Sequence, residues 1–248
     1  MSLRAAVSTF SIVPVGRAEV RASLLAWLPL VGGALGALAG LVFAALVSIN
    51  DKTVLLAAFL AVGALALLTR GLHLDGLADT ADGLGSRTPS DQALEIMRRS
   101  DIGPFGVVTL VIVLGVDVAA LTSVTGKWHV LAALAVAATT ARLSVVHAAL
   151  RGVPSARPSG FGSLVAGTVR RPLAAAETVL VLGFGAGAAA LCDINPLRWV
   201  AVQAVALMLV YAFRVHTTRR LGGVTGDVFG ALIEVGTAVT LVGLALFS

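Results

Sequence analysis

The sequence predicts an all-α protein that crosses a membrane several times, and three observations support this. Of the 248 residues, 58% are hydrophobic and 12% are charged, with a mean hydropathy of +0.97, whereas soluble domains carry about 25% charged residues. Long apolar segments follow one another along the chain. The 27 glycines suit close packing of helices in lipid. A water-soluble fold of this length could not bury so much apolar surface.

Seven segments are candidates for membrane-spanning helices, since a helix needs about 20 mostly apolar residues to cross a bilayer. They are Leu25–Ile49, Val54–Leu68, Phe105–Val124, Val130–Leu150, Leu173–Leu191, Leu197–Phe213 and Phe229–Phe247. The second, fifth and sixth of these are short. All seven are expected to be helical, because lipid offers no hydrogen-bond partner to open backbone groups.

The basic residues predict the orientation of the chain. Fourteen of the 18 precede the first segment or follow the second, fourth and sixth. These are Arg4, Arg17, Arg21, Arg70, Arg87, Arg98, Arg99, Arg151, Arg157, Arg170, Arg171, Arg214, Arg219 and Arg220. Because Lys and Arg are in excess in cytoplasmic loops, we expect a cytoplasmic N-terminus and an external C-terminus. The chain is then one integral membrane domain, residues 1–248, with a cytoplasmic motif loop at residues 69–104 that contains a surface helix, Asp91–Arg99, capped by Ser90.

The first acidic motif lies in this loop, where six of the thirteen acidic residues fall between Asp75 and Asp101. Asp75, Asp79 and Asp82 are spaced i, i+4 and i+7, which places three carboxylates on one face of a helix. Such like charges repel, and a divalent cation such as Mg²⁺ would turn the repulsion into coordination. The alternative is a solvated acidic face, but that would also carry Lys and Glu rather than Leu, Ala, Thr and Gly. His73 projects away from the carboxylates and is a candidate base or phosphate ligand.

The second acidic motif opens the last predicted span with Asp227 and Glu234, seven residues apart and therefore on one helical face. Glu234 lies within an apolar run, where a carboxylate costs about 2.5 kcal/mol or more unless it is paired or hydrated. Gly222 and Gly223 precede this motif and either bring backbone amides to an anion or simply form a turn. We expect both acidic motifs to face one cavity at the cytoplasmic side, bordered by the arginine loops, because a single cation site would compensate both.

Several arginines beside glycines suit a phosphorylated substrate, because the guanidinium group matches phosphate oxygens well. Arg142 differs from the others in being a charge within a predicted span. The candidate substrate- or phosphate-binding residues are Arg87, Arg98, Arg99, Arg142, Arg157, Gly222, Gly223 and Thr225. The acidic residues interpreted as ordinary charges at span ends or interfaces are Asp51, Asp117, Glu177 and Asp193. The net charge of +5 does not indicate nucleic-acid binding, since the basic residues are not clustered with aromatic ones.

Four motifs, in order along residues 10 to 240, resemble the cobalamin synthase family, also called the adenosylcobinamide-GDP ribazoletransferase or cobalamin-5'-phosphate synthase family. They are Gly71-x-His73-x-Asp75-Gly76-Leu77-Ala78-Asp79-x-x-Asp82-Gly83; Ile96-Met97 through Ser100-x-Ile102-Gly103-x-x-Gly106; Ala156-Arg157-Pro158-x-Gly160-x-Gly162; and Gly222-Gly223-x-Thr225-Gly226-Asp227-x-x-Gly230-Ala231-x-x-Glu234. The stretch Phe10-Ser-Ile-Val-Pro14-Val also looks like the opening of that family. The first and last motifs are long and specific.

The resemblance implies a magnesium-dependent transferase of the cell inner membrane whose active site faces the cytoplasm. Members of the family join adenosylcobinamide-GDP to alpha-ribazole or its 5'-phosphate and release GMP, a late step of cobalamin biosynthesis. It implies Mg²⁺ ligands among Asp75, Asp79, Asp82, Asp227 and Glu234. It also implies that a carboxylate, Asp79 or Asp82, or else His73, takes the proton from the attacking ribose hydroxyl. A homo-oligomer, or association with other cobalamin-assembly enzymes, stays open.

Two other functions are alternatives. Asp79-x-x-Asp82-Gly83-x-x-Ser86-Arg87 looks like the opening of the CDP-alcohol phosphotransferase signature, but the position where a glycine should continue it is Ile96. An ion-coupled transporter would bind its ion near the midplane of the membrane through acidic residues. The acidic motifs lie mainly at the cytoplasmic end instead, and paired inverted halves are not apparent in the sequence.

The predicted orientation can be tested by labelling single cysteines in a Cys192→Ser background. Cysteines at Ser86 and Ser163 should react with an impermeant thiol reagent only after cells are opened, because both positions lie in arginine-rich loops. A cysteine at Lys127 should react in intact cells. The reverse pattern would invert the topology and place the motifs away from cytoplasmic nucleotides.

Overall fold

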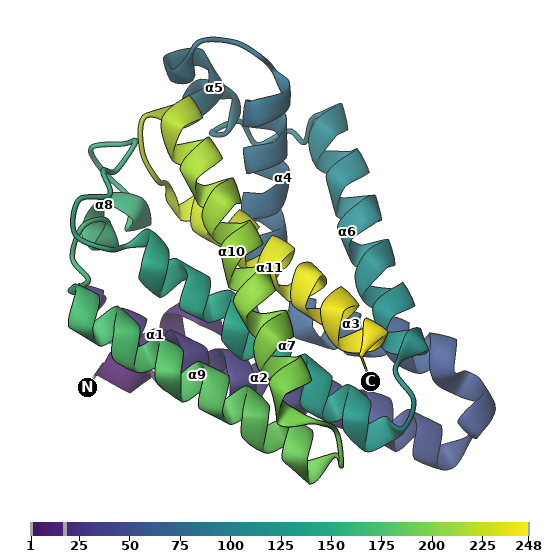
Figure 1. Cartoon of the computed structure of the whole chain (residues 1–248). Helices are drawn as coiled ribbons and strands as arrows, with labels where there is room; N and C mark the ends of the chain where they lie inside the picture. The colour runs from purple at the N-terminus through teal and green to yellow at the C-terminus, as the bar shows by residue number, and fades with distance from the viewer. Residues whose placement is uncertain (1, 17–18, 248) are drawn as a thin grey trace.

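The computed structural model describes residues 2–16 and 19–247, and Figure 1 shows that it is built from helices. They are α1 (Ser2–Phe10), η1 (Ala22–Trp27), α2 (Leu28–Ile49), η2 (Asp51–Thr53), α3 (Val54–Leu68), α4 (Leu72–Gly85), α5 (Ser90–Ile96), α6 (Pro104–Ser123), α7 (Lys127–Ala148), α8 (Phe161–Val165), α9 (Arg171–Leu191), α10 (Pro196–Leu221) and α11 (Gly226–Leu246). No named strand occurs within these described ranges, so the all-α prediction is confirmed. Arg17, counted above among the basic residues, lies outside them.

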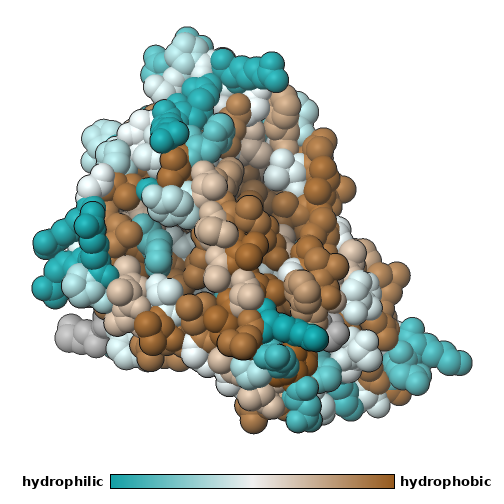
Figure 2. Space-filling model, in the orientation of Figure 1, coloured by the Kyte–Doolittle hydropathy of each residue, from teal (hydrophilic) through white to brown (hydrophobic). Residues whose placement is uncertain are grey.

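Seven helical segments in the described part of the chain are long and apolar enough to cross a membrane. They are Ala22–Ile49, Asp51–Leu68, Pro104–Ser123, Lys127–Ala148, Arg171–Leu191, Pro196–Leu221 and Gly226–Leu246. Each overlaps one of the seven predicted segments over most of its length, and α10 continues past the predicted end at Phe213 through its basic last turn. Figure 2 shows hydrophobic side chains over α6 and α10. Hydrophilic side chains gather near α5 and α8, and a second group of them lies at the lower right of the view, at the other end of the bundle. The protein is therefore a multi-pass membrane protein.

Helices α7 and α11 form the centre of the bundle, and α7 is buried along most of its length. Helix α2 packs along α7 through three glycines one turn apart, Gly32, Gly36 and Gly40. A Cβ on any of them would collide with the backbone of α7 at or near Ala138, Leu134 or Leu131. Hydrophobicity does not hold helices together within lipid, so this close backbone approach supplies the van der Waals contact that does.

The predicted motif loop at residues 69–104 is largely helical, because its first half forms α4, which packs between α11 and α6. The surface helix predicted at Asp91–Arg99 is the shorter α5. Its N-cap is Pro89 rather than Ser90, which is already the first helical residue. The extended ψ of Pro89, 158°, lets the helix start at the next residue without a side-chain cap. Turn-type bonds to the carbonyls of Glu95 and Ile96 then end it.

The contact between α2 and α7 predicts a strong size limit at Gly36. Gly36→Leu should lower the free energy of unfolding by about 1–3 kcal/mol, because the new side chain must displace the backbone of α7. Thermal unfolding in detergent measures the change. Gly63→Leu in α3 is the matched control, since nothing lies within 4 Å of a Cβ built there. Equal unfolding midpoints for the two variants would contradict this packing.

Candidate active site

The two long motifs meet where α4 crosses the start of α11. A Cβ on Gly76 would lie 2.7 Å from the carbonyl oxygen of Asp227, and a Cβ on Gly230 would lie 3.0 Å from that of His73. Only glycine allows the two backbones to touch in this way. The contact brings Asp75 and Asp79 of α4 to the same place as Asp227.

Two adjoining cavities open at this crossing. The first, of about 470 Å³, is lined by residues of α1, α4, α11 and the segment 155–162, among them Phe10, His73 and Arg157. The second, of about 900 Å³, is lined by α4 and the segment 97–102. Arg70, Leu72 and Asp75 line both cavities and form the border between them.

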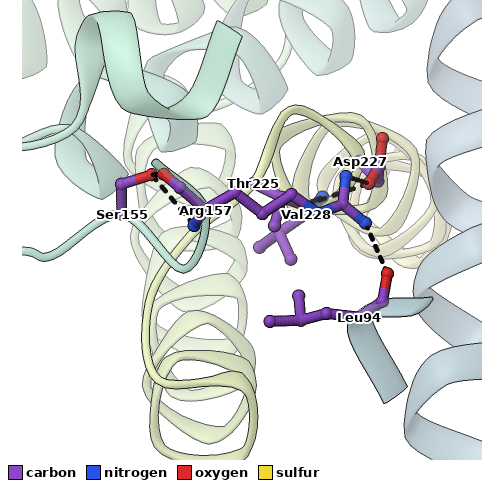
Figure 3. A network of polar contacts seen from close by, with 6 residues as sticks. All are labelled: Leu94, Ser155, Arg157, Thr225, Asp227 and Val228. Atoms are coloured by element: carbon purple, nitrogen blue, oxygen red, sulfur yellow. Dashed lines mark hydrogen bonds and ion pairs between the residues drawn. The ribbon is translucent and has the colours of Figure 1, made fainter. Parts of the chain in front are cut away.

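Arg157 connects its own loop to α11 and to α5, as Figure 3 shows. Its guanidinium donates to Asp227 Oδ2 over 2.9 Å and to the carbonyl of Leu94 over 3.1 Å. Thr225 caps α11 by accepting from the Val228 amide and lies 3.3 Å from the same carboxylate oxygen. The predicted residues Arg157, Thr225 and Asp227 therefore form one network at the start of α11.

Gly222 and Gly223 contribute to this network through backbone conformation rather than through side-chain contacts. Gly222 ends α10 with a φ of 79°, in the left-handed region that favours glycine. A Cβ on Gly223 would collide with the backbone at Ser155 and Ala156, so the segment 154–156 can pair with Val224 through two backbone hydrogen bonds. Neither glycine lines the two cavities, so the structure supports the simpler interpretation of these residues as a turn.

Asp79 lines the second cavity, and its carboxyl group has a strongly shifted pKa. Burial, followed by the negative charges of Asp75 and Asp227, raises the pKa of this carboxyl to about 7. Arg157 acts in the opposite direction but does not cancel the effect. A cation bound among these three carboxylates would remove the repulsion.

Asp82 stands apart from the other carboxylates of its motif. It is buried, lines neither cavity, and accepts hydrogen bonds from the amides of Gly103 (2.8 Å) and Gly106 (2.9 Å) at the start of α6. Both oxygens thus satisfy amides that the first helical turn leaves without partners, at the end of α6 where the helix dipole favours a negative charge.

Glu234 and Arg142 lie deeper in the bundle, beneath His73. The Nδ1 atom of His73 lies 3.5 Å from Arg142 Nη2 and 3.8 Å from Glu234 Oε1. Burial and then the charge of Arg142 hold the pKa of His73 well below its usual value, so the imidazole is neutral. Glu234 is two helical turns, or about 10 Å, beyond Asp227. It lines a separate small cavity, so the expected single cavity for both acidic residues of α11 is wrong.

Asp117 corrects a further interpretation from the sequence. It is not a span-end charge but a buried residue inside α6, and it lines a small cavity together with Glu234 and Thr237. Hydropathy did not single it out, since one carboxylate changes the mean of a 20-residue apolar segment only slightly.

The remaining predicted arginines divide into two groups. Arg98 and Arg99 line the second cavity and Arg157 lines the first, so the arginine loops border two adjoining cavities rather than the single cavity expected. Arg87 is exposed beyond the far end of α4 and lines neither cavity. Arg70, which the sequence reading did not select, lines both, and its position directly before the motif glycine Gly71 was the available signal.

No three carboxylate, imidazole or thiol groups among the described residues already converge as a metal site. The metal ligands therefore stay a prediction, and the geometry brings together only part of the proposed set. Carboxylates and arginines that share a cavity at the end of a membrane bundle are typical of enzymes that transfer phosphate-linked groups. The fold and site thus define a multi-pass membrane transferase.

Comparison with known proteins gives the family. The cobalamin-5-phosphate synthase family profile matches residues 2–245, and the chain belongs to this family. Three relatives carry the name adenosylcobinamide-GDP ribazoletransferase. The protein of Frankia casuarinae is 39% identical to this chain over 99% of this chain and 95% of its own length. The protein of Bradyrhizobium diazoefficiens is 36% identical over 99% of this chain and 93% of its own length. The protein of Escherichia coli is 37% identical over 87% of this chain and 85% of its own length. No solved structure matches.

The contacts of Asp82 predict a stability defect. Asp82→Asn replaces one accepting oxygen by a donor that faces an amide, which should cost about 1–3 kcal/mol of unfolding free energy. The thermal midpoint in detergent should fall. Asp79→Asn is the matched control and should keep a midpoint near that of the wild type, since Asp79 faces a cavity. An unchanged midpoint for Asp82→Asn would contradict its role at the start of α6.

Proposed function

We propose that this chain is an adenosylcobinamide-GDP ribazoletransferase, joining adenosylcobinamide-GDP to alpha-ribazole or its 5'-phosphate with release of GMP. The observation that carries the proposal is the meeting of the motif carboxylates Asp75, Asp79 and Asp227 with Arg157 at the border of two cavities. Family membership and the names of the relatives support the same reaction.

Mg²⁺ is the proposed cofactor, and the chemistry of the available donors fits it. Asp75, Asp79 and Asp227 offer hard carboxylate oxygens, and Mg²⁺ usually completes its shell with water and substrate phosphate. The pKa of Asp79 is raised first by burial and then by the negative charges of Asp75 and Asp227, and a cation would relieve this repulsion. When bound, the ion would neutralise charge on the pyrophosphate and on the departing GMP. Asp82 accepts two amide hydrogen bonds at the start of α6 and lines neither cavity, so it is not part of this proposed ligand set.

The arginines have different proposed roles in binding the substrate. Arg98 and Arg99 can bind phosphate in the second cavity. Arg70, at the border between the two cavities, can contact the phosphate that is transferred. Arg157 is already bound to Asp227, so it orients this carboxylate as well as offering positive charge. The attacking ribose hydroxyl must lose its proton, and Asp75 is the carboxylate that faces both cavities to accept it.

The proposed location is the cell inner membrane, with both cavities facing the cytoplasm. The charge of the loops supports this orientation, since the segments that line the cavities belong to the arginine-rich side. Nucleotide-activated substrates are made in the cytoplasm, so an active site on that face would have direct access to them.

The reaction can be tested with purified protein in detergent. Adenosylcobinamide-GDP, alpha-ribazole and Mg²⁺ should yield GMP and cobalamin, and removal of Mg²⁺ by a chelator should stop the reaction. Asp79→Asn should lower the rate by about a thousandfold, because a metal ligand stabilises charge in the transition state. Asp91→Asn, an exposed carboxylate on α5 outside both cavities, is the control and should keep wild-type turnover. Near-normal turnover of Asp79→Asn would refute the metal assignment.

A further inference from the structure

The first cavity has aromatic walls that phosphate binding does not require. Phe10, Phe161 and Phe229 line it together with His73. Phe161 contacts Phe10 edge to face at a ring distance of 5.4 Å and Phe229 at 6.1 Å, and Phe10 stacks toward His73 at 6.1 Å. Such walls suit a flat aromatic group rather than a phosphate.

His73 lines this cavity and carries an unpaired polar atom. The side chain is almost fully buried, and Nε2 has no hydrogen-bond partner among the residues that the structure describes. The other ring nitrogen, Nδ1, hydrogen-bonds with Arg142 Nη2 at 3.5 Å, and a guanidinium can only donate, whereas Glu234 Oε1 at 3.8 Å is too far away to accept a hydrogen bond from it. Nδ1 is therefore the acceptor, which leaves the proton of the imidazole on Nε2. A buried N–H without a partner is costly, so a ligand with an acceptor atom is expected opposite it.

The border between the cavities indicates which substrate enters which side. Phosphoryl transfer needs the attacking and leaving oxygens roughly in line, on opposite sides of the phosphorus. Arg70 and Asp75 line both cavities, so phosphorus held there has one cavity on each side. The second cavity contains Arg98 and Arg99 and no aromatic lining residue, which suits the pyrophosphate and departing GMP.

We propose that the first cavity binds the aromatic base of the acceptor nucleoside, with His73 Nε2–H donating to its bare ring nitrogen. The proposal rests on the proposed function, which makes alpha-ribazole the acceptor. Its benzimidazole base is flat, is attached to ribose through one nitrogen, and has an unsubstituted second nitrogen that only accepts. A cavity of about 470 Å³ also lies in the size range of small-ligand sites.

A pair of nucleosides tests this recognition in the wild-type protein. We compare alpha-ribazole with the matching nucleoside in which an indole C–H replaces the unsubstituted ring nitrogen. Binding is followed by the fluorescence anisotropy of the base, without the corrinoid substrate. The indole nucleoside should bind about tenfold more weakly, because it leaves the buried N–H unpaired. Equal affinities would overturn the proposal, and this comparison needs no variant that has to fold.

Variants separate the hydrogen bond from the aromatic wall. His73→Phe should lose the preference between the two nucleosides, whereas Phe161→Leu should weaken both and keep it. Phe184→Leu, exposed on α9, is the matched control and should change neither affinity. A preference that persists in His73→Phe would overturn the role of His73.

Competition and turnover distinguish this proposal from the proposed function. GMP should not displace bound alpha-ribazole, and displacement with simple competition would put guanine in the first cavity and overturn the assignment. With the indole nucleoside in place of alpha-ribazole, the nucleoside concentration that gives half-maximal GMP release should rise by about the same tenfold. The maximal rate of GMP release should stay similar, because the changed atom is remote from the reacting hydroxyl. Discriminating binding without any GMP release would refute the function and leave the base site standing.

Discussion

The backbone contact between α4 and α11 is the constraint on which the site depends. Gly76 lies against Asp227, and Gly230 lies against His73, so the two helices cross with no side chain between them. Glycine inside a helix costs about 0.5–1 kcal/mol relative to alanine. Here it allows a crossing that places carboxylates from distant parts of the sequence around one point. A methyl group at either position would move α4 away from α11 and separate them.

The parts around this crossing hold one another through polar contacts rather than through apolar packing alone. Arg157 ties α11 to the end of α5 through Asp227 and the carbonyl of Leu94. On the other side of α4, Asp82 fixes the start of α6 and thereby the segment that borders the second cavity. One acidic residue of the first motif thus supports the site while its neighbours face the cavities. A shared position on one face of a helix did not give these carboxylates equal roles.

Beneath the cavities lies a polar group of His73, Arg142 and Glu234 in the interior of the bundle, with Asp117 beside Glu234 at a small cavity. Charged groups at such depth are tolerated only when they compensate one another. Arg142 contacts the Nδ1 atom of His73, and His73 in turn lines the first cavity. The deep charges therefore connect to the site through one imidazole rather than by contacting substrate themselves.

The sequence by itself determined the membrane class, the seven spans and the family, and it located Val54–Leu68 at the bounds that α3 has in the structure. It could do so because transfer into lipid depends on the composition of each segment. It also found most of the residues that meet at the cavities. Only the tertiary structure decided that Asp82 turns to α6, that Glu234 lies two turns too deep, and that Arg70 stands at the border of both cavities. Helical periodicity fixes a face relative to its own axis, whereas the neighbouring helices decide what that face meets.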